Sequence, residues 1–207
     1  MNITFSSREL RDLVVAWLAL GLAFAIFFAG GGQRAIGLLL SGTFGLALLV
    51  SLLTAGVAFL FHEVAHKVVA VRFGQVAEFR ADYGMLGIAV MSALIGFIFA
   101  APGAVHHRGM LTKREHGLIA LAGPAMNLVL VVAFVPIFVA GVALNSGLVE
   151  LVGARGLVIN AFLAAFNMLP FASLDGRTVK AWSTPVFAGM FAVSALLTVV
   201  LLLFVGF

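Results

Sequence analysis

The pentapeptide His62-Glu63-Val64-Ala65-His66 carries the residue types and the spacing of a metal-dependent hydrolase. The preceding stretch, Ile36–Phe61, contains no charged side chain, so these three ionisable groups lie in a segment that reads as membrane. Residues four apart on a helix share a face, so His62 and His66 can bind one metal ion together. Glu63 lies beside that face and can act as a base on a metal-bound water. The spacing therefore predicts a metallohydrolase whose active site lies within the bilayer.

The competing interpretation is a buried polar cluster whose hydrogen bonds join two helices. Placing ionisable groups in hydrocarbon costs free energy, and such groups usually mark functional sites in membrane proteins. Three of them within one helical turn therefore favour a metal site over simple helix packing.

Composition defines the class of protein. The chain has 207 residues, of which 63% are hydrophobic and only 10% are charged. Soluble domains carry about 25% charged residues, so we expect an integral membrane protein, with one domain over residues 1–207. The absence of cysteine excludes disulfides, thiolate metal sites and cysteine nucleophiles. The net charge of +4 is spread over short loops, which indicates topology signals and lipid contact and makes a nucleic-acid role unexpected.

Six apolar segments follow one another along the chain. They are Leu13–Ala29, Ile36–Val71, Met85–Ala101, Gly117–Leu144, Leu151–Leu169 and Val186–Phe207. The first exceeds the ~7–15 apolar residues of a signal peptide, so we expect a retained first span. The second exceeds the ~20 residues needed to cross a bilayer, so it is tilted, broken near Ser41-Gly42, or projects from the membrane.

The segment Met85–Ala101 decides the topology. If it crosses the bilayer, the twelve Lys and Arg residues divide evenly between the two sides and give no orientation. If it enters and returns, or lies at the interface, only Arg34 and Arg155 fall on one side. The ten basic residues on the other side are Arg8, Arg11, Lys67, Arg72, Arg80, Arg108, Lys113, Arg114, Arg177 and Lys180. This asymmetry favours a non-crossing segment, with the N-terminus and the active-site end in the cytoplasm.

A catalytic zinc usually takes three protein ligands and keeps one position open for water. Among the eight acidic residues, only Asp175 follows closely on apolar chain and lies beside a flexible glycine, Gly176. A non-crossing Met85–Ala101 also places Asp175 on the same side of the membrane as the two histidines. On the residues alone, however, a solvated carboxylate next to Arg177 is an equally good interpretation of Asp175.

Three motifs together give the chain a specific resemblance. The pentapeptide fits H-E-x-x-H, Asn167–Gly176 fits N-x-x-P-x-x-x-L-D-G, and Ala122–Asn127 fits A-G-P-x-x-N. In this order, and on membrane segments, they resemble the site-2 protease family of intramembrane zinc metalloproteases. The resemblance covers a core of about residues 46–180. The chain departs from many relatives in two ways. It has no PDZ insertion, and its apolar piece at Met85–Ala101 is longer.

The resemblance implies a mechanism and a set of partners. One Zn²⁺ per chain is held by His62, His66 and Asp175, while Glu63 moves the proton of the attacking water. Asn167 matches the family asparagine that steadies the substrate or the oxyanion. The substrate is a transmembrane protein cut within or next to its membrane segment, and the surroundings are the lipid bilayer of the cell membrane. We expect Gly123, Pro124 and Asn127 to serve helix packing.

The expected fold is an all-α polytopic membrane protein. It has about five transmembrane helices, one re-entrant or interfacial segment and at most a short β element, at the extended piece Ala104–His106. A substrate must unwind locally to expose its peptide bonds, and this extended edge can receive it as an added strand. Two alternatives remain: a transporter or metal carrier that uses the His62, His66 and Asp175 site for transit, and an inactive family member that only binds. Transporters usually show repeated halves, which this chain lacks. The sequence does not define an oligomeric state.

Overall fold

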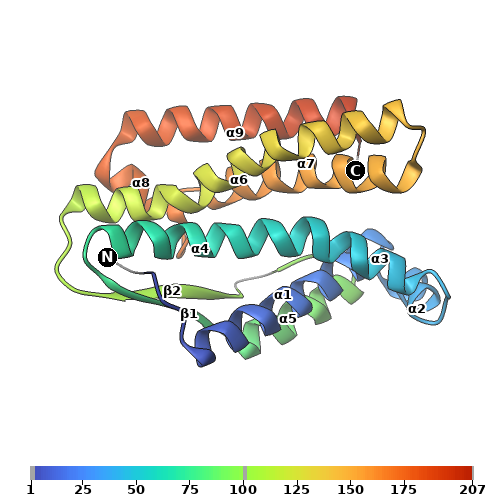
Figure 1. Cartoon of the computed structure of the whole chain (residues 1–207), viewed down its shortest axis with the longest axis horizontal. Coiled ribbons are helices and arrows are strands. Elements are labelled where there is room, and N and C mark those ends of the chain that lie inside the picture. Colours follow the sequence, from blue (N-terminus) through green and yellow to red (C-terminus); the bar gives the residue numbers. More distant parts are fainter. Residues whose placement is uncertain (1–2, 100–101, 207) are drawn as a thin grey trace. The chain divides into compact units, whose positions relative to one another are not determined.

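The computed structural model describes residues 3–99 and 102–206 of the chain, and it is mostly helical (Figure 1). Ala101 and Phe207, the ends of two predicted apolar segments, lie outside the described residues. The elements in chain order are α1 (Ser7–Phe28), α2 (Gly32–Leu39), α3 (Phe44–Ser51), the π-helical turn η1 (Leu52–Gly56), α4 (Val57–Arg72), β1 (Val76–Ala81), α5 (Tyr83–Leu94), β2 (Gly103–Arg108), α6 (Lys113–Ala143), α7 (Gly147–Asn167), α8 (Asp175–Trp182) and α9 (Thr184–Phe204).

Within residues 3–99 and 102–206, five helical stretches are long and apolar enough to cross a membrane. They are Ser7–Phe28, Phe44–Arg72, Lys113–Ala143, Gly147–Asn167 and Thr184–Phe204. The predicted fold class, five spanning helices with a short β element, is therefore confirmed. The chain forms two compact units.

Unit 2 consists of Thr4–Leu60 and Glu78–His106. The side chain of Ser6 caps α1 by accepting the backbone N–H of Glu9 at 3.1 Å, as the Ser-x-x-Glu pattern predicts. Helix α1 packs against α3, η1 and α5 around a core that includes Leu13, Leu20 and Leu86.

The long apolar segment Ile36–Val71 is broken, one of the three outcomes left open by the sequence. Helix α2 ends at Leu39, and α3 begins at Phe44. The Ser41 hydroxyl donates to the carbonyl of Leu38 at 2.8 Å, which stabilises the turn between the two helices. Helix α3 then continues through η1 into α4. The indole of Trp17 donates to the carbonyl of Leu52 at 3.0 Å, so α1 contacts the π-helical turn directly.

Helix α5 is too short to cross a bilayer. Its twelve residues span about 18 Å, whereas the hydrocarbon core is ~30 Å thick. The helix ends at Leu94, and Gly96 turns the chain with a φ of 81°, a conformation that favours glycine. The segment Met85–Ala101 therefore contains no spanning helix within its described residues, as its charge pattern predicts.

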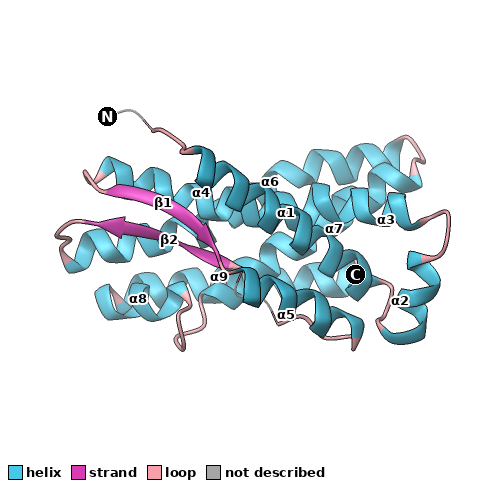
Figure 2. Cartoon of the chain, turned by 90° about the horizontal axis from the view of Figure 1, so that it is seen from below, coloured by secondary structure: helices cyan, strands magenta, loops and turns pink. Residues whose placement is uncertain are grey.

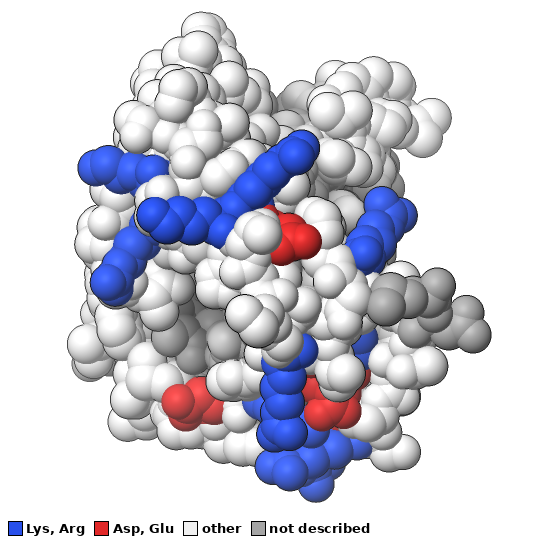
Figure 3. All heavy atoms as spheres, turned by 90° about the vertical axis from the view of Figure 1, so that its left-hand side faces the viewer, with Lys and Arg blue, Asp and Glu red and all other residues white. Residues whose placement is uncertain are grey.

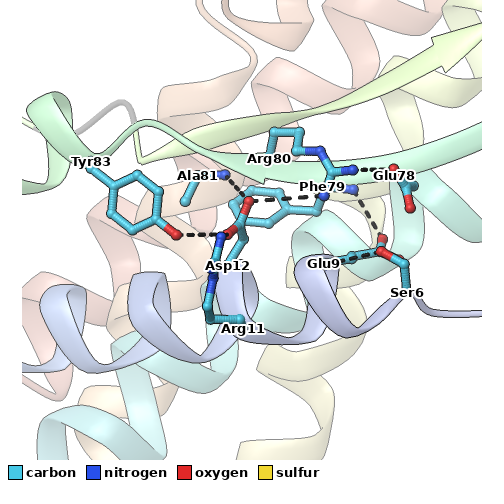
Figure 4. Close-up of polar contacts among 9 residues, drawn as sticks. All are labelled: Ser6, Glu9, Arg11, Asp12, Glu78, Phe79, Arg80, Ala81 and Tyr83. Carbon is cyan, nitrogen blue, oxygen red and sulfur yellow. Dashed lines mark hydrogen bonds and ion pairs between the residues drawn. The ribbon is translucent and has the colours of Figure 1, made fainter.

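The β element is a two-stranded sheet of β1 and β2 (Figure 2). Strand β2 contains the predicted extended piece Ala104–His106, but β1 was not predicted. The outer edge of β1 is occupied by carboxylates of α1 (Figure 4). The N–H of Phe79 donates to Glu9 at 2.9 Å, and the N–H of Ala81 donates to Asp12 at 3.4 Å. Because these acids cover one edge of the sheet, an added strand would have to pair with β2.

Unit 1 is formed mainly by Phe61–Ala77 and His107–Phe207. Helix α6 begins with a capping box in which Thr112 and Glu115 satisfy each other's backbone N–H, the arrangement that a Thr-x-x-Glu pattern favours. The N-cap of α9 is Ser183. Helix α6 packs against α7 and α8, and α9 packs against α7 and α8. At Gly156 of α7, a Cβ would collide with the ring of Phe134 of α6, so glycine permits the close packing of these two helices.

Candidate metal centre

Helix α4 presents His62 and His66 on one face, as the spacing of four residues requires. Both side chains are buried, and their Nε2 atoms lie 3.0 Å apart. The two rings meet edge to face, with centroids 4.7 Å apart. Two potential ligand atoms of one helix thus point at the same place.

Asp175 is the first residue of α8, and the structure brings it to the two histidines. Its Oδ2 lies 3.3 Å from Nε2 of His62 and 3.4 Å from Nε2 of His66. The neighbouring Gly176 explains this placement, because a Cβ there would collide with the carbonyl of Met168 just after α7. Burial acts to raise the pKa of the Asp175 carboxyl, but positive charge at His66 and His62 outweighs burial and holds the pKa below its usual range. Asp175 is therefore available as an anionic ligand.

Helix α6 lies against the other side of the histidines. Ile119, Gly123 and Asn127 are spaced by four and share one face of this helix. The Nδ1 of His66 lies 2.7 Å from the carbonyl oxygen of Ile119, and the Nδ1 of His62 lies 2.6 Å from Oδ1 of Asn127. The earlier histidine meets the later residue of α6, so the two helices run antiparallel where they cross.

These hydrogen bonds leave a lone pair on Nε2 of His62 and on Nε2 of His66 when the rings are neutral. A carbonyl oxygen only accepts, so Nδ1 of His66 carries the proton and its Nε2 in the neutral ring does not. With the amide of Asn127 oriented as it is, the same holds for His62. Two imidazole lone pairs and a carboxylate oxygen then face one another within 3.4 Å. Such an arrangement requires a positive charge among the three atoms.

The three separations suit a divalent metal ion. Ligands about 2.05 Å from a tetrahedral zinc lie ~3.3 Å from one another, and the observed separations are 3.0, 3.3 and 3.4 Å. Space for the ion is provided by Gly123. A Cβ at this position would lie 2.5 Å from Nε2 of His62 and closer still to Nε2 of His66. The donor set and the space beside it therefore fit a metal ion.

Glu63 lies next to the three ligands without being one of them. It is buried, and its carboxyl group interacts electrostatically with His66, His62 and Asp175. This is the position expected of a base that takes a proton from a water bound to a metal ion at these ligands.

Asn167, the other predicted catalytic residue, lies at the C-terminal end of α7. Its side-chain amide donates to the carbonyl of Leu163 at 3.0 Å, one turn earlier in the same helix. The metal cluster itself consists of His62, His66 and Asp175.

Gly123 and Asn127 have contacts beyond the helix packing that was predicted for them. Gly123 does permit the close approach of α6, but the atoms that it accommodates are the ligand nitrogens themselves. Asn127 holds His62 through Nδ1. The spacing of four between these two residues in Ala122–Asn127 was the available signal, because it places both on the face that α4 contacts.

Comparison with known proteins supports this assignment. No family model matches the chain, and no solved structure matches it. The protein named "Putative zinc metalloprotease MJ0611" of Methanocaldococcus jannaschii is 37% identical over 186 residues, which cover 89% of each chain. The chain belongs to the site-2 protease family of intramembrane metalloproteases.

Two further relatives carry the same kind of name. "Putative zinc metalloprotease Rip3" of Mycobacterium tuberculosis is 34% identical over 82% of this chain, but the match spans only 39% of Rip3. "Putative zinc metalloprotease YwhC" of Bacillus subtilis is 30% identical over 61% of this chain and 65% of its own length. This site-2 protease is thus a metallopeptidase with helices long and apolar enough to cross a membrane and with a His-His-Asp cluster.

Gly123→Ala tests the space beside the ligands. Alanine favours the helix, but its methyl group would take the place beside both Nε2 atoms, so we expect the variant to fold and to lose metal binding. Gly189→Ala in α9 is the matched control, because a Cβ there meets nothing within 4 Å. The measurements are bound metal per chain and the melting temperature of each purified variant. Full metal content in Gly123→Ala would show that the ion is held elsewhere.

Proposed function

We propose that this site-2 protease hydrolyses a peptide bond within or next to a substrate transmembrane segment, using one zinc ion per chain. The supporting observation is the convergence of three potential ligands, the buried His62 and His66 and the partly buried Asp175, whose ligand atoms lie within 3.4 Å of one another. Residues 1–207 act as a single protease domain.

In hydrolysis, Glu63 transfers the proton of the attacking water. Zinc, when bound, polarises the scissile carbonyl and makes water acidic enough to attack near neutral pH. Glu63 takes the proton of that water and delivers it to the leaving amine. The burial of Glu63 excludes bulk water, so the proton stays within the site.

Asn167 positions the substrate. Its amide nitrogen has two N–H groups, and the bond to the carbonyl of Leu163 uses one of them. The bond holds the side chain at the end of α7, and the second N–H can donate to a substrate carbonyl. Donors of this kind contribute about 3 kcal/mol when they act on the transition state.

The substrate segment unwinds and pairs with β2. The carboxylates of Glu9 and Asp12 already occupy the outer edge of β1, so β2 provides the sheet edge for an incoming strand. Backbone hydrogen bonds form with many different side-chain sequences, which suits a protease that recognises the unwound state of its substrate.

The active-site end faces the cytoplasm of a cell-membrane protein. Lys and Arg side chains are exposed on the face that Figure 3 shows. Within unit 1, α4 ends at Arg72 and α6 begins at Lys113, both exposed. His66 precedes Arg72 by six residues, or about 9 Å of helix. The metal centre is thus close to the basic end of its helix, which the positive-inside rule assigns to the cytoplasm.

Glu63→Gln separates a protease from a metal carrier. Glutamine keeps the shape of the side chain but cannot accept the proton, so we expect bound zinc to remain and cleavage to fall by at least 100-fold. Glu150→Gln, a change at an exposed position of α7, is the control. The assay is zinc content together with cleavage of a model transmembrane helix. A Glu63→Gln variant that still cleaves at the wild-type rate would remove Glu63 from the mechanism.

Proline in β2 tests strand addition. Successive N–H groups point to opposite edges, so either Ala104→Pro or Val105→Pro removes a donor from the outer edge. We expect that variant to cleave a model helix at least tenfold more slowly while keeping its zinc. Ala104→Ser and Val105→Thr keep the N–H and serve as controls. Unchanged cleavage in both proline variants would rule out pairing at this edge.

A further inference from the structure

A second asparagine lies behind the residue that holds His62. The amide nitrogen of Asn127 donates to Oδ1 of Asn160 at 3.0 Å, and the amide nitrogen of Asn160 donates to the carbonyl of Gly156 at 2.8 Å. Neither asparagine side chain is accessible to solvent. With the 2.6 Å contact between Nδ1 of His62 and Asn127, these bonds form an unbroken chain from His62 through α6 to the backbone of α7.

The carbonyl of Gly156 determines the donor and the acceptor in every hydrogen bond of this series. The carbonyl of Gly156 can only accept, so Asn160 must turn its NH₂ group to it and its oxygen to Asn127. Asn127 must then turn its NH₂ group to Asn160 and its oxygen to His62. The oxygen accepts only if Nδ1 of His62 carries the proton. This leaves a lone pair on Nε2, the atom that faces Asp175.

We propose that Asn127 and Asn160 are positioning residues that fix His62 in its metal-binding tautomer. This inference rests on the proposed zinc site. His66 needs no such pair of side chains, because the carbonyl of Ile119 accepts directly from its Nδ1 and so keeps the proton on that atom. The site thus uses a backbone carbonyl for each histidine: Ile119 for His66 by direct contact, and Gly156 for His62 through two side chains.

Without Asn160, the amide of Asn127 loses the acceptor that directs its NH₂ group away from His62. A half-turn of the amide would place NH₂ against Nδ1 of His62 and move the imidazole proton to Nε2, where it blocks the metal. Groups that orient metal-binding histidines in this way contribute 10- to 100-fold to metal affinity, as an order of magnitude. A role in joining α6 to α7 alone would affect the stability of the protein but not its affinity for zinc.

Two matched pairs of variants separate these roles. Asn160→Leu removes the relay, whereas Asn160→Ser keeps its direction, since a serine hydroxyl in a helix donates to the carbonyl four residues earlier and can still accept from Asn127. Asn127→Leu removes the acceptor for His62, whereas Asn127→Asp keeps it. Ser194→Ala is the control, because Ser194 is equally buried in α9 and donates to the carbonyl of Met190 at 2.8 Å with no link to a histidine.

The readouts are the zinc dissociation constant, from competition with a chelator, and the visible spectrum of the Co²⁺-loaded protein. We expect zinc to bind about 10- to 100-fold more weakly to each leucine variant, with an altered Co²⁺ spectrum. Asn160→Ser, Asn127→Asp and Ser194→Ala should stay within about threefold of wild type. If one leucine variant does not fold, the zinc affinity of the other still tests the relay.

Wild-type zinc affinity and an unchanged Co²⁺ spectrum in a folded leucine variant would overturn the relay. An equal loss of affinity in Ser194→Ala would also overturn it, because the effect would then reflect stability alone. If the wild-type protein itself does not bind zinc, the proposed function fails, and this outcome is distinct from failure of the relay.

Discussion

The close crossing of α4 and α6 at Gly123 is the contact on which the metal centre depends. Because Gly123 has no side chain, the face of α6 can approach the two Nε2 atoms of His62 and His66 and leave space beside them. The residues one turn to either side, Ile119 and Asn127, then reach the Nδ1 atoms. One glycine thereby sets the distance between the helices, the space for the ion and the hydrogen bonds that orient both rings.

The rest of unit 1 completes what this crossing begins. Asp175 is placed by the first turn of α8, which approaches the end of α7 because Gly176 has no Cβ. Asn160 of α7 connects the orientation of His62 to the carbonyl of Gly156. Buried polar groups are costly in a membrane protein unless each is hydrogen-bonded or bound to an ion. In this site, the bonds that satisfy these groups are also the bonds that prepare the ligands.

The sequence predicted those features that depend on local spacing and on charge. The histidine pair follows from a spacing of four, and the five spanning helices follow from length and composition. The uneven distribution of Lys and Arg predicted that Met85–Ala101 does not cross, and the short α5 agrees. The choice of Asp175 needed the family motif as well, since on the residues alone a solvated carboxylate next to Arg177 was an equally good interpretation.

Features that depend on contacts between distant segments were missed. Strand β1 is stabilised by Glu9 and Asp12, about seventy residues earlier in the chain, and no local pattern reveals such partners. Asn160 lies in α7 within an apolar run, and only the packing of α6 on α7 connects it to His62. Asn127 was visible in its motif, but its role depends on which helix faces it.

The central claim is that His62, His66 and Asp175 together hold a catalytic zinc ion. Metal analysis of the purified wild type and of Asp175→Ala, with cleavage of a model membrane helix measured alongside, tests it most directly. We expect one zinc per wild-type chain, and loss of both zinc and cleavage in the variant. Retention of zinc and full cleavage by Asp175→Ala would contradict the assignment.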